Sequence, residues 1–307
     1  MNNDMYNDIA EKKEIEQLTQ FISQFISLVA KNLPTDIEAA LEQLKDDEEK
    51  PLAKELYECI FQNLKMAKDL QRPICQDTGI VQFFIKAGTK FPYLDEIEDI
   101  LKNAVLDATQ RTPLRHNAVK TFSEHNTGTN CGKGVPWIEW EIIPKSSELH
   151  FDVYFAGGGC SLPGRSKVFM PADGYEGIVK YVLDTVVDWG VNACPPLIVG
   201  VGIGSCSPTA AILSKKALLR PVGTINSNSQ AAELESLLKE GLNNIGIGPL
   251  GLTGKKSVMD VHVEFADHHP ATLAAGISVG CWATRRGSVT INADFSYKIH
   301  SHSQNEI

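Results

Sequence analysis

Three cysteines lie beside residues that break helices and strands, where a side chain is exposed for chemistry rather than packed in a core. Cys75 opens the segment Cys75-Gln76-Asp77-Thr78-Gly79, which places a thiol, an amide and a carboxylate on one turn. Cys194 precedes two prolines, and Cys281 is followed by the pair Arg285-Arg286. Nearby cations favour the thiolate, the form that binds metals. Three distant thiolates near a carboxylate and arginines therefore predict an iron–sulfur cluster that acts on a small anionic acid.

Each of these segments also has an ordinary structural interpretation. Asp77 can bond its own backbone in an Asx turn beside a buried cysteine. The two prolines after Cys194 stiffen the backbone, which suits a strand entry as well as a metal-binding loop. Cys281 could equally be a sheet cysteine near solvated arginines. Local chemistry alone leaves these alternatives open.

The other four cysteines are judged by their neighbours. Cys59 lies in an apolar helical stretch and is expected to pack in the core, whereas Cys131 is expected to be a loop thiol. Spacing does not exclude Cys160 or Cys206 as ligands. The total of seven cysteines is odd, and no CxxC pair is present, which argues against a disulfide framework, a zinc ribbon and a thioredoxin-type redox site.

Three further groups could bind an anion. The run Gly157-Gly158-Gly159 lets backbone N–H groups approach an anion closely, although an ordinary turn would look the same. Arg115 could form a forked contact with a carboxylate, but a single loop arginine is usually solvated. Among the eight histidines, His262, His268 and His269 are each more often structural than catalytic.

Composition narrows the class of protein. The net charge of −9 argues against a nucleic-acid or anionic-membrane partner, because both require a basic surface. The polar segment 1–16 lacks the basic and apolar regions of a secretory signal, and the apolar run 194–204 is too short to cross a bilayer. We therefore expect a cytoplasmic protein.

Apolar periodicity predicts an α/β fold. Helices are expected at 14–32, 52–70, 95–109, 174–188, 208–219 and 230–244. Strands are expected at 80–86, 137–143, 149–155, 197–203, 259–266, 272–279 and 287–293. The strand at 197–203 is uniformly apolar, as expected when both faces of a strand are buried. No linker or repeat is evident, so residues 1–307 are expected to form a single domain with a polar tail after 296.

The Cys75–Gly79 segment resembles the class I fumarase family of iron–sulfur hydro-lyases. The similarity extends over about 10–295, and the motifs that carry it occur in the order of that family. These motifs are Leu114-Arg115-His116-Asn117, Asn126-Thr127-Gly128, Ala156 to Gly159, Cys194-Pro195-Pro196, Leu242 to Pro249, and Cys281. The resemblance implies the fold of the N-terminal domain of these enzymes, with mixed sheets flanked by helices.

The resemblance also implies a set of site residues. Cys75, Cys194 and Cys281 would be the three ligands of a 4Fe–4S cluster, leaving one iron open as a Lewis acid. Asp77 would take part in catalysis. The implied substrate contacts are Gln76, Arg115, Gly157, Gly158, Gly159 and His269, the last chosen over His268 because it precedes Cys281 by twelve residues.

Within the family, the chain is most similar to the alpha subunits of the tartrate-dehydrating branch. The distinguishing segments are 134–137, 159–167 and 281–287. This similarity implies removal of water from L(+)-tartrate to give oxaloacetate, with hydration of fumarate to L-malate as the rival reaction. A non-catalytic iron–sulfur oxygen sensor and a metal-free binding protein are rivals from other classes.

The family enzymes have a second domain that supplies further substrate cations and the proton-abstracting group. This chain ends soon after Cys281. The resemblance therefore implies a separate beta subunit that carries the other half of the active site, in an α2β2 heterotetramer that acts on a small dicarboxylic acid.

Overall fold

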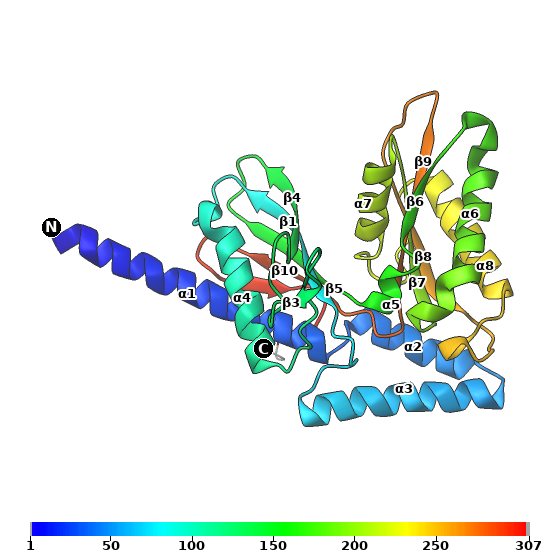
Figure 1. Cartoon of the computed structure of the whole chain (residues 1–307), viewed down its shortest axis with the longest axis horizontal. Coiled ribbons are helices and arrows are strands. Elements are labelled where there is room, and N and C mark those ends of the chain that lie inside the picture. Colours follow the sequence, from blue (N-terminus) through cyan, green and yellow to red (C-terminus); the bar gives the residue numbers. More distant parts are fainter. Residues whose placement is uncertain (1, 305–307) are drawn as a thin grey trace. The chain divides into compact units, whose positions relative to one another are not determined.

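The computed structural model describes residues 2–304, and their side chains from residue 11 onward. The chain separates into two compact units, each assembled from segments that are distant in sequence (Figure 1). Unit 1 comprises Met1–Pro34, Leu64–Ala156 and Arg285–Ile307, and unit 2 comprises Thr35–Asn63 and Gly157–Thr284. The expectation from the sequence that residues 1–307 form a single domain stays a prediction.

Unit 1 is built on a five-stranded mixed sheet with the order β11-β10-β5-β1-β4. The strands are β1 (Ile80–Gly88), β4 (Trp137–Ile143), β5 (Leu149–Ala156), β10 (Arg286–Ile291) and β11 (Tyr297–Ile299). β1 runs parallel to β4 and antiparallel to β5. Helices α1 (Asn2–Lys31) and α4 (Ile97–Arg111) pack together, and β2 (Val119–Lys120) and β3 (His125–Asn126) form a small hairpin.

The core of unit 1 explains why α1 lies close to the sheet. Phe25 and Phe151 meet edge-on with their ring centres 5.9 Å apart, and both side chains are fully buried. A Cβ atom on Gly287 of β10 would come within 2.3 Å of Val29. Because only a glycine leaves that space, α1 can press its apolar side onto the strand.

Unit 2 is built on a four-stranded sheet with the order β6-β9-β7-β8. The strands are β6 (Arg165–Phe169), β7 (Leu197–Gly204), β8 (Val258–Phe265) and β9 (Leu273–Gly280). The helices of this unit are α2 (Thr35–Asp47), α5 (Gly158–Ser161), α6 (Gly174–Trp189), α7 (Ser207–Ala217) and α8 (Ser229–Asn244), and α3 (Pro51–Leu70) contributes residues to both units.

Helices cover both faces of the sheet in unit 2 (Figure 1). α6 and α8 pack their apolar side chains on one face, against alternate residues of β7 such as Val199 and Val201. α7 packs on the other face, where β7 has Gly200 and Gly202 in place of larger residues. A Cβ on Gly202 would lie 2.0 Å from the carbonyl oxygen of Ala210. β7 is therefore buried along its whole length, as its sequence predicts.

The predicted α/β class with mixed sheets flanked by helices is confirmed. All the predicted helices and strands are present. β4 and β5 do not pair with each other across their short connection, because β1 lies between them. Four strands escaped prediction: β2 and β3 of the small hairpin, β6, and the short β11 in the polar tail.

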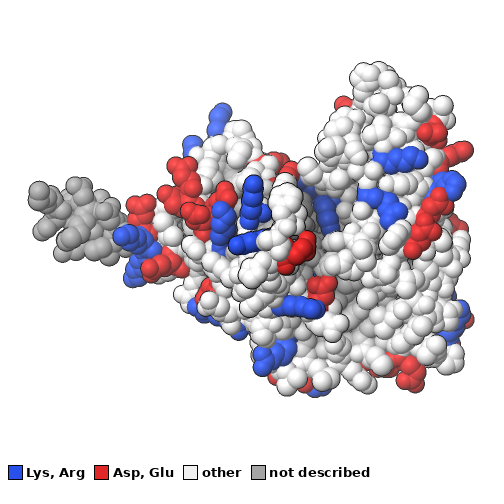
Figure 2. Space-filling view, in the orientation of Figure 1, with Lys and Arg blue, Asp and Glu red and all other residues white. Residues whose placement is uncertain are grey.

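No helix among residues 2–304 combines the length and the apolar character required to cross a membrane. Figure 2 shows Lys and Arg side chains interspersed with Asp and Glu on the face drawn, with wide uncharged areas between them. On this face the charges of the two signs are mixed and form no broad area of positive charge.

Candidate functional site

The Cys75 turn connects α3 to β1 in unit 1. Cys75 and Asp77 are half-buried, whereas Gln76 is exposed. The Oδ1 atom of Asp77 accepts a hydrogen bond of 3.1 Å from the backbone N–H of Gly79, which has a φ of 76°. The turn is thus an Asx turn closed by a glycine in the left-handed region, and it presents the thiol, amide and carboxylate together.

Thr78 ties this turn to the loop that carries Arg115. Its hydroxyl is buried and accepts a 3.0 Å hydrogen bond from the Arg115 N–H. Asn117 Nδ2 donates to the carbonyl oxygen of Gly79 over 3.0 Å, and Asn130 Oδ1 accepts from the Asn117 N–H over 2.9 Å. Unit 1 therefore ties the loop of the exposed Arg115 to the turn of Gln76 and Asp77, and the predicted roles of these residues stay predictions.

Arg285 holds the same turn from another direction. Its Nη2 atom donates a 2.8 Å hydrogen bond to the backbone oxygen of Asp77. Its guanidinium lies 5.6 Å from the ring centre of Phe155, and its own carbonyl accepts from the Phe155 N–H over 3.0 Å. Sequence reasoning considered this arginine only as a cation near Cys281 and missed its contact with Asp77. The only sequence signal for it is the pair Arg285-Arg286 at the start of β10.

Cys194 occupies a strained position in unit 2. Its φ and ψ of 53° and 78° lie in the left-handed region, which costs a non-glycine residue on the order of 1 kcal/mol. Its thiol is exposed. The strain is maintained by hydrogen bonds on both sides: the Cys194 carbonyl accepts from Trp282 N over 3.2 Å, and the Pro195 carbonyl accepts from Leu250 N over 2.8 Å.

Cys281 follows directly after β9 and is nearly buried, with 9% of its surface exposed. Its carbonyl accepts hydrogen bonds from the N–H and the hydroxyl of Thr284, over 3.1 and 2.7 Å. Because the next residue, Trp282, donates to Cys194, the two cysteine segments lie side by side in unit 2.

The three glycines lie against the Cys194 segment. Gly157 precedes α5, which begins at Gly158. A Cβ on Gly159 would lie 2.5 Å from the carbonyl oxygen of Asn192, so only glycine fits. The glycine run, Cys194 and Cys281 therefore form one group at one end of the sheet of unit 2.

His269 lies elsewhere in unit 2. It belongs to the turn before β9, whereas Cys281 follows the strand. Eight residues of strand span roughly 26 Å at 3.3 Å per residue, and Figure 1 shows this orange turn at the far end of the sheet from α5. Its Nδ1 accepts from Ala271 N over 3.1 Å, which leaves the proton of a neutral ring on Nε2. The structure does not bring His269 to the cysteines of its own unit, and its role stays a prediction.

The other cysteines differ in their surroundings, and none of the seven forms a disulfide. Cys59 is exposed on α3, so the prediction that it packs in the core was wrong: the apolar stripe of that helix faces another direction. Cys131 is half-buried, and burial raises the pKa of its thiol. Cys160 packs against the core of unit 2. Cys206 is exposed, and a hydrogen bond from Thr209 lowers the pKa of its thiol.

Among the described side chains, residues 11–304, no three His, Cys, Asp or Glu residues are already gathered around a metal position. Of the three predicted ligands, Cys75 belongs to unit 1, and Cys194 and Cys281 belong to unit 2. The donor set nevertheless fits a cluster that takes three cysteine ligands. Two of the three lie on adjacent segments, and the exposed Cys194 has a left-handed backbone that hydrogen bonds to its own carbonyl and to that of Pro195 hold in place.

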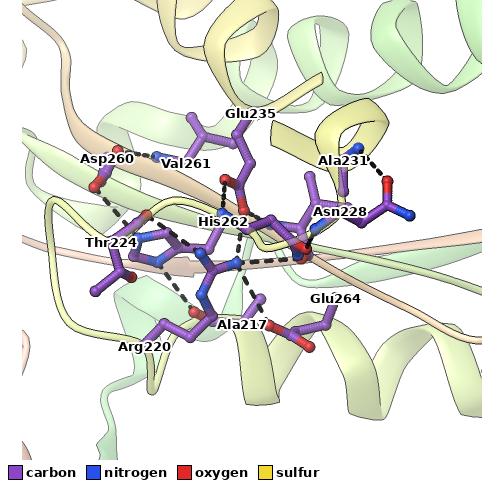
Figure 3. Close-up of polar contacts among 12 residues, drawn as sticks. Ala217, Arg220, Thr224, Asn228, Ala231, Glu235, Asp260, Val261, His262 and Glu264 are labelled. Carbon is purple, nitrogen blue, oxygen red and sulfur yellow. Dashed lines mark hydrogen bonds and ion pairs between the residues drawn. The ribbon is translucent and has the colours of Figure 1, made fainter. Parts of the chain in front are cut away.

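A second group of polar side chains in unit 2 involves α8, β8 and the loop after α7 (Figure 3). Glu235 of α8 is buried, and its Oε1 accepts from Arg220 Nη1 over 2.6 Å and from Val263 N over 2.9 Å. Arg220 Nη1 also lies 3.4 Å from Glu264. These contacts hold the loop after α7 against α8 and β8, a structural role.

Asp260 extends this group. Its Oδ2 accepts from Gly223 N over 2.6 Å and lies 3.3 Å from Nε2 of the fully buried His262, while Oδ1 accepts from Lys239 over 3.0 Å. Burial alone would raise the pKa of Asp260, but the contacts with His262, Gly223 and Lys239 outweigh it and hold the pKa well below its usual value.

The model of the fumarate hydratase (Fumerase) family matches residues 19–290. The chain belongs to this family. It is 49% identical over 303 residues to the L(+)-tartrate dehydratase subunit alpha of Escherichia coli strain K12, which covers 99% of this chain and 100% of that protein. It is 37% identical over 265 residues to a putative L(+)-tartrate dehydratase subunit alpha of Methanocaldococcus jannaschii, covering 85% and 93% of the two chains.

Membership of the fumarate hydratase family makes the chain a hydro-lyase, and the predicted family and reaction class are confirmed. The relatives are named as alpha subunits, so a partner subunit is implied. The cysteine ligands, the substrate contacts and the cytoplasmic location stay predictions.

Proposed function

We propose that this chain is the alpha subunit of a 4Fe–4S hydro-lyase that converts L(+)-tartrate to oxaloacetate and water. The observation that carries the proposal is 49% identity along almost the whole chain to an L(+)-tartrate dehydratase alpha subunit. A beta subunit would complete the active site in an α2β2 assembly. The reaction removes a proton from C2 and a hydroxyl from C3, and the resulting enol becomes the ketone.

Cys75, Cys194 and Cys281 would hold the cluster. When bound, such a cluster supplies Lewis-acid chemistry at the one iron that no cysteine occupies. The adjacent Cys194 and Cys281 segments and the strained backbone of Cys194 support this assignment. Cys194 directly follows the short 3-10 helix Gly190–Ala193 and Cys281 directly follows β9, whereas Cys75 lies in the loop between α3 and β1.

The residues around the cysteines would bind and orient the substrate. The backbone of Arg115 is held by its hydrogen bond to Thr78, and its side chain presents a guanidinium. The glycine run offers backbone N–H groups beside Asn192. Both are suited to carboxylate oxygens, on which charge grows as the C2 proton leaves. Asp77, oriented by Gly79, would assist this proton transfer together with a base of the partner subunit, and Gln76 would contact a substrate hydroxyl or carboxylate.

Fumarate hydration is the alternative reaction. The segment 159–167 favours tartrate, because it differs from the sequence usual in fumarases. In unit 2, Ser161 Oγ donates to the Gly157 carbonyl over 2.9 Å, and Arg165 stacks on Trp189 with its guanidinium 5.3 Å from the ring centre. The distinguishing segment begins at the last glycine of the run, and the Ser161 contact ties it back to Gly157, which supports a role for this segment in the choice of substrate.

The proposed reaction is tested by a product assay. The chain is co-expressed with its beta partner, purified without oxygen and reconstituted with iron and sulfide. Oxaloacetate formed from L(+)-tartrate is compared with L-malate formed from fumarate. We expect kcat/KM for tartrate to exceed that for fumarate at least a hundredfold. A preference for fumarate would move the chain to the fumarases, and a loaded cluster with neither activity would favour the oxygen sensor.

A further inference from the structure

Arg285 belongs to unit 1 and is not used by the proposed reaction, and it is almost completely buried, with 3% of its surface exposed. A guanidinium removed from water is destabilising unless hydrogen bonds and favourable contacts compensate. In this structure it donates 2.8 Å to the Asp77 carbonyl and lies over the ring of Phe155. The hydrogen bond comes from the turn that carries the candidate catalytic carboxylate, and the ring contact comes from β5.

Asp77 is restrained at two different atoms. Gly79 N donates to its side-chain Oδ1, which limits rotation of the carboxylate. Arg285 donates to its backbone oxygen, which limits rotation of the peptide between Asp77 and Thr78. Without the second bond, the turn would still close but could change its tilt relative to β1.

Arg285 is itself rigidly placed. Its carbonyl accepts from Phe155 N over 3.0 Å, and Phe155 lies opposite Val81 in the pairing of β5 with β1. Arg286 then begins β10, which pairs with β5 from Arg286↔Tyr154 onward. The arginine therefore connects the turn to the sheet, through its hydrogen bond to Asp77 and its contact with the ring of Phe155. A lysine cannot make both contacts at once in the same geometry.

From this geometry we propose that Arg285 is a positioning residue: it fixes the Asp77 peptide so that the Gln76 and Asp77 side chains are oriented before a cluster or a substrate binds. Its effect on turnover rests on the proposed function. A different role for the same arginine would be a purely electrostatic one, in which its charge attracts the anionic substrate. The two roles differ in what a lysine can replace.

The first experiment measures amide hydrogen exchange in the full-length chain before any cluster is reconstituted. We expect Arg285→Met to accelerate exchange of the amides of residues 76–80 at least tenfold, and Arg285→Lys to do so by a smaller factor. Arg220→Met is the matched control, because it removes another largely buried arginine with carbonyl partners in unit 2. Exchange at 76–80 unchanged in both Arg285 variants would overturn the proposal, and if Arg285→Met does not fold, Arg285→Lys decides.

The second experiment compares kcat and KM in the loaded enzyme with its partner. Positioning predicts that kcat falls at least tenfold in Arg285→Met and remains reduced in Arg285→Lys, while KM changes less than threefold. Normal kinetics in Arg285→Lys with a raised KM in Arg285→Met would overturn positioning in favour of electrostatic attraction. Failure of the wild-type chain to dehydrate tartrate would refute the proposed function, whereas the exchange measurement would still test the placement of the turn.

Discussion

Removing one charge from the buried polar group of unit 2 gives a stability prediction that follows directly from the structure (Figure 3). Glu235→Gln keeps the size of the side chain. The carboxylate now accepts from Arg220 and Val263 N through Oε1 and from Asn226 N through Oε2. An amide has one acceptor oxygen, so either orientation turns its NH2 group toward at least one N–H donor.

The size of the effect comes from two opposing terms. Breaking a buried ion pair from one side costs about 3–5 kcal/mol. Glu264, 3.4 Å from Arg220 Nη1, still balances part of the arginine charge in the variant. We therefore expect Glu235→Gln to lower the free energy of unfolding by about 2–3 kcal/mol, the cost of one unsatisfied buried donor plus a weakened pair.

Urea denaturation followed by far-ultraviolet circular dichroism measures this loss. The control is Asp184→Asn, which makes the same chemical change in an exposed pair with Lys180, where the side chains are 57% and 75% exposed. An exposed pair contributes at most about 0.5 kcal/mol. If Glu235→Gln and Asp184→Asn unfold at the same urea concentration, Glu235 does not stabilise unit 2 and the reasoning is refuted.

Three further predictions concern Asp260, β7 and Asp77. Because the folded-state pKa of Asp260 is depressed, Asp260→Asn should lower the free energy of unfolding by roughly 2 kcal/mol at pH values above the unfolded pKa of about 3.9. The difference from wild type should shrink as the pH falls below that value. A difference that grows on acidification would contradict this prediction. Gly202→Ala should destabilise by roughly 1–3 kcal/mol, because its Cβ would overlap the Ala210 carbonyl at 2.0 Å, whereas Gly204→Ala, with its nearest atom at 3.3 Å, should cost clearly less in the same urea titration. Asp77→Asn should retain the cluster spectrum but lower kcat on the order of a hundredfold or more, and near-normal turnover with full iron content would remove Asp77 from the mechanism.

Apolar patterning predicted the elements whose burial is decided by their own side chains. β7 is uniformly apolar and is buried on both faces, and the stripe of α1 does face a core. β6, with the sequence Arg165–Phe169, carries two cations and shows no alternation, so only its backbone pairing with β9 makes it a strand. Such pairing is a tertiary effect that local sequence does not contain.

The candidate site likewise has residues that the sequence reveals and contacts that it does not. Cysteines beside structure breakers could be recognised from sequence, because turns expose side chains whatever the fold. The exposure of Cys59 could not be predicted, because which side of a helix is buried depends on what the helix packs against. The contact between Arg285 and Asp77 joins residues 208 positions apart, and the separation of His269 from Cys281 follows from the direction of β9. Both depend on how the strands are arranged.

The most direct test of the account is the iron and acid-labile sulfide content of cysteine variants purified without oxygen and reconstituted identically. We predict that Cys75→Ser, Cys194→Ser and Cys281→Ser each lose the 4Fe–4S absorption and tartrate turnover together. Cys59→Ser and Cys206→Ser, which replace exposed thiols outside the proposed ligand set, should retain both. A full cluster in any of the first three variants, or its loss in either of the last two, would contradict the assignment.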